Sequence, residues 1–378
     1  MRFSAAQEGI LSVNVGSSTL KFALYPVTGD GVQAAIQVGT IDTLQLDEAA
    51  FDAALDSLIR RLTEATPALR LRAVVHRVVH GGTKFQTSVR VTESVLQDLA
   101  QLNALAPLHQ PHNLEGIRRF WRALPKVPQI ACFDTAFHAS MPAQEARFAL
   151  PEALFQQGIR RYGFHGLSYQ HVRDTLTLRS SRAGGRLLMA HLGSGASLCA
   201  AREGRSMAST MGFTALDGLM MGTRCGALDP GVLLYLMNLG WSPERLETLL
   251  YRQSGLLGVS GLSADFRVLR AAVGDDRAKC AIDLFTASVV REAGAMAAVL
   301  GGLDLLAFTG GIGEHDAQLR TDVAGRLAHL GVVLDPVKNR EGRQGQAEAI
   351  HARESAVEVW VVPADEGLAA AKEAFRLL

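Results

Sequence analysis

The clearest pattern along the chain is a pair of short apolar runs joined by a small polar turn. Ile10–Val15 and Leu20–Tyr25 flank Gly16-Ser17-Ser18. This layout predicts two strands of a hairpin, because apolar runs bounded by glycine and serine are typical of strands that end in a tight turn. The turn would present backbone N–H groups and hydroxyls, which together suit a phosphate group.

The same pattern returns further along the chain. Leu187–Leu192 and Ser197–Ala201 flank Gly193-Ser194-Gly195. Two such units about 175 residues apart predict an internally duplicated protein in which each half offers one turn to the same polyphosphate. A chain of 378 residues also exceeds the usual size of a single core. We expect a first domain over residues 1–150, completed by a C-terminal helix at about 365–378, and a second domain over 151–364.

The segments around these units alternate between strand and helix patterns. Phe51–Leu62 has the spacing of an amphipathic helix, and Ala73–Val79 is a β-branched run that predicts a buried strand. Asp304–Thr309 predicts another strand, and the glycine turn Gly310–Glu314 and a helix-competent segment follow it. A strand, a glycine turn and a helix start form a typical anion or nucleotide site. The alternation predicts the α/β class.

Composition and charge exclude several classes of protein. The net charge of +1 comes from 38 basic and 37 acidic side chains without a long basic run, so neither nucleic acid nor a membrane surface is an expected partner. The apolar run near the N-terminus is too short for a signal peptide or a membrane span, which predicts a cytoplasmic location. The four widely spaced cysteines predict reduced thiols and no zinc site: Cys132, Cys199, Cys225 and Cys280.

Seven motifs occur in an order that resembles acetate kinases from Val13 to Leu368. They are Asn14-Val15-Gly16-Ser17-Ser18, His76-Arg77-Val78-Val79-His80-Gly81-Gly82, Phe133-Asp134-Thr135-Ala136-Phe137-His138, Tyr162-Gly163-Phe164-His165-Gly166, Met221-Gly222-Thr223-Arg224-Cys225-Gly226, Asp265-Phe266-Arg267 and Gly311-Ile312-Gly313-Glu314. The resemblance implies a duplicated actin-like (ribonuclease H-like) fold with an interdomain cleft. It also implies reversible transfer of the ATP γ-phosphoryl group to acetate, and a homodimer through the second domain. Propionate or a longer short-chain acid is the alternative acceptor.

Two arginines fit this chemistry, because the transition state of phosphoryl transfer is crowded with negative charge. On a strand, Arg77 shares a face with Val75 and Val79, so a fork of donors lies beside an apolar wall that suits a short fatty acid. The alternative is a structural arginine paired with Asp134. Glycines flank Arg224 and allow its backbone to approach a ligand. The resemblance assigns Arg77 to acid binding and Arg224 to catalysis.

The resemblance also assigns catalysis to His165 and Asp134. His165 would donate to the phosphoryl group, although a lone histidine is more often a structural residue. The family's matching aspartate is described as a general acid or base, but a fatty-acid carboxylate is already ionised at pH 7 and has no proton to lose. We therefore expect Asp134 to orient Arg77 or a hydrated metal. His76 and His80 lie on a predicted strand without other soft ligands and are interpreted as structural.

The metal and nucleotide contacts follow from the resemblance. Asn14 and Glu366 match residues associated with Mg²⁺, with Mn²⁺ as the alternative, and both are hard oxygen donors. Without the resemblance, a solvated residue at the start of a C-terminal helix is the favoured interpretation of Glu366. The matching nucleotide contacts are Lys21, His191, Leu192, Gly193, Ser194, Gly195, Asp265, Phe266, Arg267, Gly311, Ile312, Gly313, Glu314 and His315.

Several positions depart from the family pattern. Val79, Leu108, Phe164 and Ala215 match the pocket for the alkyl end of the acid, but proline is usual at position 215. Asparagine is usual at the positions of Ser194 and His315. The preferred acid therefore stays open. A non-catalytic actin-like ATP-binding regulator and a butyrate kinase are the rival interpretations.

Overall fold

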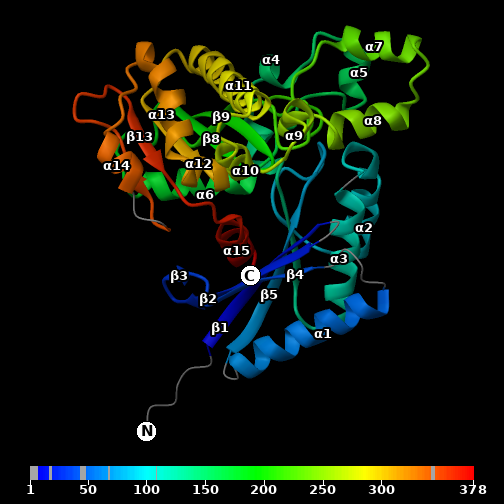
Figure 1. Ribbon diagram of the computed structural model, residues 1–378. Helices are drawn as coiled ribbons and strands as arrows, with labels where there is room; N and C mark the ends of the chain where they lie inside the picture. The colour runs from blue at the N-terminus through cyan, green and yellow to red at the C-terminus, as the bar shows by residue number, and fades with distance from the viewer. Residues whose placement is uncertain (1–6, 17–18, 43–47, 67–68, 108, 342–344) are drawn as a thin grey trace. The chain divides into compact units, whose positions relative to one another are not determined.

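The computed structural model describes residues 7–16, 19–42, 48–66, 69–107, 109–341 and 345–378 (Figure 1). The chain forms two compact units. The first contains the residues up to Phe137, Gly166–His171 and Asp365–Leu378, and the second contains His138–His165 and Val172–Ala364. His138, at the start of the second unit, lies with its Nδ1 2.8 Å from Ser206 Oγ of the same unit.

The first unit is built on a mixed sheet in the order β3-β2-β1-β5-β7-β6, with β4 paired to β2. Its strands are β1 (Gln7–Val15), β2 (Thr19–Thr28), β3 (Gly31–Val32), β4 (Gln37–Asp42), β5 (Leu69–Val78), β6 (Val89–Arg90) and β7 (Gln129–Phe133). β1 and β2 pair in antiparallel fashion, so the predicted hairpin is confirmed. Gly16 N donates to Thr19 O at 2.8 Å to close it, while Ser17 and Ser18 lie outside the described residues.

Helices cover both faces of this sheet. They are α1 (Glu48–Ala65), α2 (Glu93–Ala100), α3 (Gln110–Ala123) and α15 (Glu366–Arg376), with the short 3-10 helix η1 (Asn103–Leu105). Side chains at alternate strand positions, including Ile10 and Val75, pack against the alanines of α15. The intervening positions, including Leu11 and Val74, pack against α1 and α3. In Figure 1, α15 accordingly lies across the sheet from α1.

The second unit has a sheet in the order β10-β9-β8-β11-β13-β12. Its strands are β8 (Leu187–Leu192), β9 (Ala196–Arg202), β10 (Arg205–Ser209), β11 (Leu305–Thr309), β12 (Glu348–Ala349) and β13 (Glu358–Val361). β8 and β9 form the second predicted hairpin, and Gly193 N donates to Gly195 O at 3.0 Å within its turn.

The two sheets repeat one plan. β1 pairs antiparallel with β2 and parallel with β5, just as β8 pairs antiparallel with β9 and parallel with β11. A third parallel strand follows in each case, β7 beside β5 and β13 beside β11, and a short antiparallel strand ends the series. The duplication predicted from the two hairpins is therefore present in the topology.

Helices of the second unit surround its sheet. They are α4 (Ala143–Ala146), α5 (Glu152–Gln156), α7 (Pro230–Asn238), α8 (Pro243–Arg252), α9 (Gly255–Ser260), α10 (Phe266–Ala271), α11 (Asp276–Leu300), α12 (Gly310–His315), α13 (Ala317–Arg326) and α14 (Pro336–Glu341), with η3 (Ala328–Leu330). Both α6 (Gly166–Thr177) and η2 (Ala136–Ser140) contain residues of the two units. Among the described helices, none combines enough length with enough apolar character to cross a membrane.

The third glycine segment differs from the expected turn. The glycines after β11 lie inside a short helix, α12, which starts directly at Gly310. Gly310 has a φ of 79°, and a Cβ there would lie 2.8 Å from the carbonyl oxygen of Leu192. Only glycine fits this approach of β11 to the end of β8, so α12 begins beside the second turn.

Candidate active site

The predicted acid and metal residues of the first unit belong to one face of its sheet. Ile10, Val75 and Cys132 pack against α15. Because side chains alternate along a strand, Asn14 and Arg77 point to that same face as their strands end. Asp134 continues the alternation one residue beyond β7.

The start of α15 adds Glu366 to this group. Arg77 donates from Nε and Nη2 to the two carboxylate oxygens of Asp134, at 3.0 and 2.6 Å. Its Nε also lies 3.2 Å from Glu366 Oε2. The structure therefore brings together the arginine, the aspartate expected to orient it and one predicted metal ligand. The side chain of Asp134 is 2% exposed, whereas Arg77 and Glu366 keep 21% and 23% of theirs exposed to solvent.

This group carries more negative than positive charge, because one guanidinium faces two carboxylates. Burial alone would lower the pKa of Arg77, but Asp134 and Glu366 raise it above its ordinary value. Arg77 therefore stays charged and its Nε–Nη2 edge is held by Asp134. Nη1 is not part of this edge. It carries two N–H donors, which a carboxylate can accept.

Asn113 of α3 is a residue that the sequence analysis missed. Its amide donates to the carbonyl oxygen of Val15 at 2.7 Å and accepts from Val79 N at 3.1 Å. Direct pairing of β1 and β5 ends at Val13 and His76. One buried amide therefore bridges the ends of the strands that carry Asn14 and Arg77. Nothing local in the sequence indicates a contact across such a distance.

In the second unit, His165 and Arg224 approach the same glycine. A Cβ built on Gly195 would lie 3.4 Å from His165 Nε2 and 3.8 Å from Arg224 Nη1. The second phosphate turn thus lies beside an imidazole and a guanidinium, and the missing side chain leaves room between them. Gly222 N donates to Ser194 O at 3.1 Å and ties the Arg224 loop to that turn.

Neighbouring groups fix the orientation of both side chains. His165 has a φ of 58° at the start of α6, its Nδ1 lies 2.8 Å from Ser197 Oγ, and its ring stacks on His191 with centroids 4.2 Å apart. Arg224 donates from Nη1 to the carbonyl oxygen of Ala215 at 2.8 Å. Ala215 therefore contacts the catalytic candidate itself, and it does so through its backbone.

A cavity of about 890 Å³ lies next to the second turn. It is lined by Gly193, Ser194, Ala264, Asp265, Phe266, Arg267, Arg270, Ala271, Gly311, Ile312, His315 and Asp316. Eight of these were predicted as nucleotide contacts from three separate segments. A volume of this size suits a nucleotide-sized ligand.

The Asp265-Phe266-Arg267 segment reaches the cavity from the start of α10. Asp265 caps this helix by accepting from Arg267 N, and its carboxylate also binds the Arg267 side chain, which lowers the pKa of Asp265 to about 2. Arg267 is 89% exposed. Phe266 is buried and packs edge-on against Phe285, with centroids 5.3 Å apart. Phe266 is thus mainly a core residue that forms part of the cavity wall.

The other predicted nucleotide residues do not line this cavity. Leu192 and Gly313 are buried, and His191 stacks on His165. Glu314 accepts from Ala364 N through Oε1, at 2.9 Å. Lys21 belongs to the first unit, where it is the cross-strand partner of Asn14.

His76 and His80, which were interpreted as structural, contact neighbouring residues of the first unit. His76 Nε2 lies 2.8 Å from Gln129 Oε1, and His80 Nδ1 accepts from Gly82 N at 2.9 Å. The alkyl-pocket residues Val79 and Phe164 are buried, and Phe164 O lies 2.9 Å from His138 Nε2. Leu108 lies outside the described residues.

Comparison with known proteins gives a consistent result. The model of the acetokinase family matches residues 9–372. The chain belongs to this family. An acetate kinase of Rhodopseudomonas palustris is 47% identical over 97% of this chain and 98% of its own. The crystal structure of Porphyromonas gingivalis acetate kinase has a TM-score of 0.85 at 34% identity, covering 98% of this chain and 99% of its own. That of a propionate kinase from Francisella tularensis has a TM-score of 0.86 at 35% identity, covering 97% and 98%.

These matches confirm the resemblance and the fold class predicted from the motifs. For this acetokinase family member, the sequence analysis missed two kinds of residue. Arg270 and Asp316, which line the cavity, form an ion pair at 3.0 Å. Ser197 and Asn113 hold predicted residues in place. Arg270 lies one helical turn after Arg267 on α10, and this spacing was the feature of the sequence that could have identified it as a cavity residue.

Proposed function

We propose that this protein catalyses the reversible transfer of the ATP γ-phosphoryl group to acetate, giving ADP and acetyl phosphate. The observation that carries the proposal is the approach of His165 Nε2 and Arg224 Nη1 to Gly195. Donors fixed in advance around one point stabilise the charge of a transferring phosphoryl group. The named relatives support acetate as the acceptor, and the propionate kinase structure supports propionate as the alternative.

The proposal assigns the nucleotide to the cavity of the second unit. Gly193 and Ser194 come from the second turn, Asp265 to Arg267 from α10, and Gly311, Ile312 and His315 from α12. His191, Leu192, Gly195, Gly313 and Glu314 complete the matching segments of the family. Lys21 is proposed as a phosphate contact from the first unit.

The acid is assigned to the face of the first sheet that carries Arg77. Asp134 occupies one edge of the guanidinium, so Nη1 is the donor left for the carboxylate of acetate. Asp134 acts as a positioning residue in this proposal. Acetate has no proton for it to remove at pH 7. The family resemblance assigns recognition of the methyl group to Val79, Leu108, Phe164 and Ala215.

The donor set at the start of α15 fits Mg²⁺, with Mn²⁺ as the alternative. Mg²⁺ is usually bound by one or two carboxylates and by substrate phosphates, and it keeps several waters. Glu366 and Asn14 supply hard oxygens, and Arg77 balances only one of the two nearby carboxylates. Among the described residues no cluster of three or more His, Cys, Asp or Glu side chains suits a metal. When bound, the ion would neutralise phosphate charge.

We also propose a homodimer through the second unit, in the cytoplasm. The nine residues of α7 include no buried side chain, although six of them are large and apolar. Leu234 and Tyr235 are 62% and 63% exposed. A second copy of this chain would cover this surface. The four cysteines are free thiols, as expected in a reducing compartment.

The test uses purified protein with Mg²⁺ in both directions. ADP and acetyl phosphate should yield ATP, and ATP with acetate should yield an acyl hydroxamate when hydroxylamine is present. EDTA should abolish both reactions. Slow ATP hydrolysis without hydroxamate from any acid between acetate and butyrate would instead support the ATP-binding regulator.

The same assay tests the two catalytic candidates. Removing one oxyanion donor costs on the order of 2.7–4 kcal/mol in other enzymes, so Arg224→Ala and His165→Ala should each lower kcat by about 10²–10³. Nucleotide affinity should change much less. An unchanged kcat in a folded Arg224→Ala variant would remove this residue from the site.

A further inference from the structure

The helix α12 has a composition that does not favour its own structure. Three of its six residues, Gly310, Gly311 and Gly313, are glycines. Gly311 and Gly313 have the low helix propensity of glycine, and a helix this short is not stable by itself. Yet Gly311, Ile312 and His315 form part of the cavity wall. Contacts from outside α12 must therefore hold it in position.

Arg320 of α13 supplies such a contact. Its side chain is 4% exposed, and Nη1 donates to the carbonyl oxygens of Gly313 at 2.9 Å and Glu314 at 2.8 Å. The last carbonyls of any helix lack partners within it. Arg320 therefore satisfies two oxygens at the end of α12 and fixes where that end lies.

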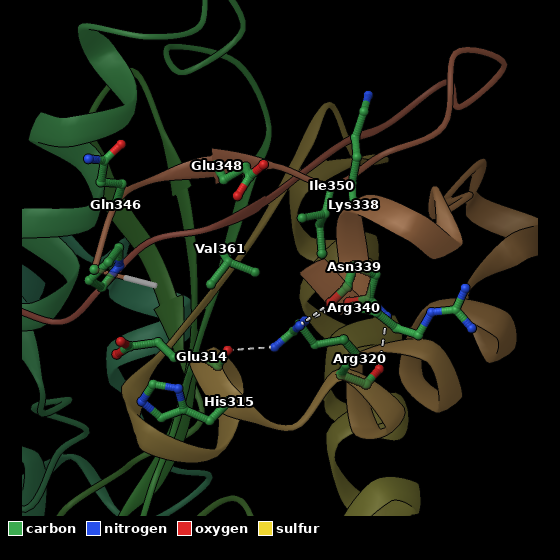
Figure 2. Close-up of a pocket in the computed structure, with 13 residues that line it drawn as sticks. Glu314, His315, Arg320, Lys338, Asn339, Arg340, Gln346, Glu348, Ile350 and Val361 are labelled. Carbon is green, nitrogen blue, oxygen red and sulfur yellow. Dashed lines mark hydrogen bonds between the residues drawn. The ribbon is translucent and has the colours of Figure 1, made fainter. Parts of the chain in front are cut away.

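Asn339 of α14 holds the other side of the guanidinium (Figure 2). Arg320 donates from Nε to Asn339 Oδ1 and from Nη2 to Asn339 O, both at 2.7 Å. The Asn339 amide in turn donates to the carbonyl oxygen of Ala317 at 2.9 Å and to Thr321 Oγ1 at 3.0 Å. The guanidinium of Arg320 thus links α12 to α14. Arg320, Ala317 and Thr321, which make these contacts with α12 and Asn339, all belong to α13.

The chemistry of this link is unusual for a buried arginine. Within the described part of the chain, the hydrogen bonds of Arg320 go to carbonyl and amide oxygens and to no carboxylate. Burial lowers the pKa of Arg320, and the charge of Asp316 partly opposes this effect. An apolar side chain would avoid the desolvation cost. It would also leave the two carbonyls of α12 without donors.

We propose that Arg320, held by Asn339, is a positioning residue for nucleotide binding. It acts through α12 and does not line the 890 Å³ cavity. It borders a separate hollow of about 120 Å³ that also includes Glu314 and His315. Figure 2 shows the Arg320 side chain, which reaches from α13 towards Glu314 of α12. The inference rests on the proposed nucleotide site, because it concerns the wall that α12 gives to a nucleoside di- or triphosphate.

The test measures ADP binding by calorimetry with the full chain and Mg²⁺. Arg320→Lys keeps the charge, but a single ammonium does not reproduce the planar fork that joins α12 to Asn339. We expect the Kd for ADP and the KM for ATP to rise at least tenfold. The kcat at saturating ATP and the KM for acetate should change less than threefold, since no acid or phosphoryl contact is touched. Asn339→Ala keeps the bonds to α12 and should raise the Kd two- to fivefold.

Arg326→Lys is the matched control, because Arg326 lies exposed on the same helix. It should bind ADP as the wild type does. A wild-type Kd in folded Arg320→Lys overturns the inference, as does an equal loss in all kinetic parameters together with a lower melting temperature. If Arg320→Lys does not fold, Asn339→Ala decides: a wild-type Kd overturns the inference.

A further variant separates this inference from the site on which it rests. A Cβ added at Gly311 would meet no atom within 4 Å, and Gly311 lines the cavity, so we expect Gly311→Leu to fold and to extend into the cavity. Wild-type ADP binding by Gly311→Leu would show that the nucleotide lies elsewhere, and both proposals would fail. Lost binding in Gly311→Leu with a wild-type Kd in Arg320→Lys would overturn only the positioning role.

Discussion

Gly195 separates the two side chains on which phosphoryl transfer is proposed to depend. A methyl group at this position would lie 3.4 Å from His165 Nε2 and 3.8 Å from Arg224 Nη1, which are ordinary contact distances. Gly195→Ala should therefore fold normally. A phosphoryl oxygen, however, needs to approach such donors to about 2.7–3.1 Å. We expect kcat to fall at least tenfold, which corresponds to about 1.4 kcal/mol in the barrier.

The control for this variant is Gly184→Ala, where an added Cβ has no neighbour within 4 Å. Both variants should keep the wild-type melting temperature. Steady-state rates for ATP and acetate give the comparison. A kcat for Gly195→Ala equal to that of Gly184→Ala would mean that no reacting group passes beside residue 195.

Position 215 offers a test of the preferred acid. Alanine stands there instead of the family's usual proline, and one additional methylene of propionate would contribute about 0.8 kcal/mol if it filled the added space. We expect the wild type to use propionate with a kcat/KM that rivals that for acetate. Ala215→Pro keeps the carbonyl that accepts from Arg224, so it should shift the preference to acetate without losing catalysis.

The measurement is kcat/KM for acetate, propionate and butyrate in both forms. Inward movement of neighbouring side chains could refill the space, since packed walls relax partially around small substitutions. A tenfold preference for acetate in the wild type, unchanged in Ala215→Pro, would exclude residue 215 as the determinant of chain length.

At the level of single elements, a buried histidine on strand β5 makes the stability of the protein depend on pH. Burial lowers the pKa of His76 on β5 to about 4, although its bond to Gln129 acts in the other direction. The unfolded chain takes up this proton near the ordinary pKa of about 6.5. Between pH 6.5 and 4 the unfolded state therefore binds more protons than the folded state. Stability should fall on acidification, by up to about 1.4 kcal/mol per pH unit for this histidine.

His76→Gln should reduce this pH dependence, because glutamine does not titrate and still has a donor for Gln129. His112→Gln changes an exposed histidine of α3 and serves as the control. Urea unfolding followed by circular dichroism between pH 7 and 4.5 gives the free energy of unfolding. Equal slopes in the wild type and His76→Gln would show that the proton uptake on unfolding involves other groups.

Local patterns predicted the sheet elements well and the glycine-rich helix poorly. The hairpins of β1–β2 and β8–β9 follow from apolar runs around a short turn, which is information held within about 15 residues. The segment Gly310–Glu314 was predicted as a turn because glycine disfavours helix. In the structure this segment is helical, Arg320 donates to two carbonyl oxygens at its end, and Asn339 of another helix binds that guanidinium. Tertiary contacts thus outweighed local preference at this point.

For the whole molecule, the sequence order of the motifs predicted the family but not all the supporting contacts. Alternation along one strand predicted that Arg77 shares a face with Val75, but the strand order that brings Asn14 and Asp134 to the same face came from the structure. Ser197, Asn113 and Arg270 were missed because they act on residues distant in the chain or belong to no motif.

The exposed apolar surface of α7 gives the last prediction, which concerns assembly. If a second copy covers Leu234 and Tyr235, the wild type should have twice the chain mass of 40.5 kDa in solution. Glutamates at both positions would bring unpaired charges into the interface, at a cost of several kcal/mol each. Leu234→Glu/Tyr235→Glu should therefore run at 40.5 kDa in light scattering, with an unchanged circular dichroism spectrum. Val273→Glu changes a residue that is 94% exposed and should remain dimeric. A monomeric wild type at micromolar concentration would exclude the homodimer, and a dimeric double variant would place the interface away from α7.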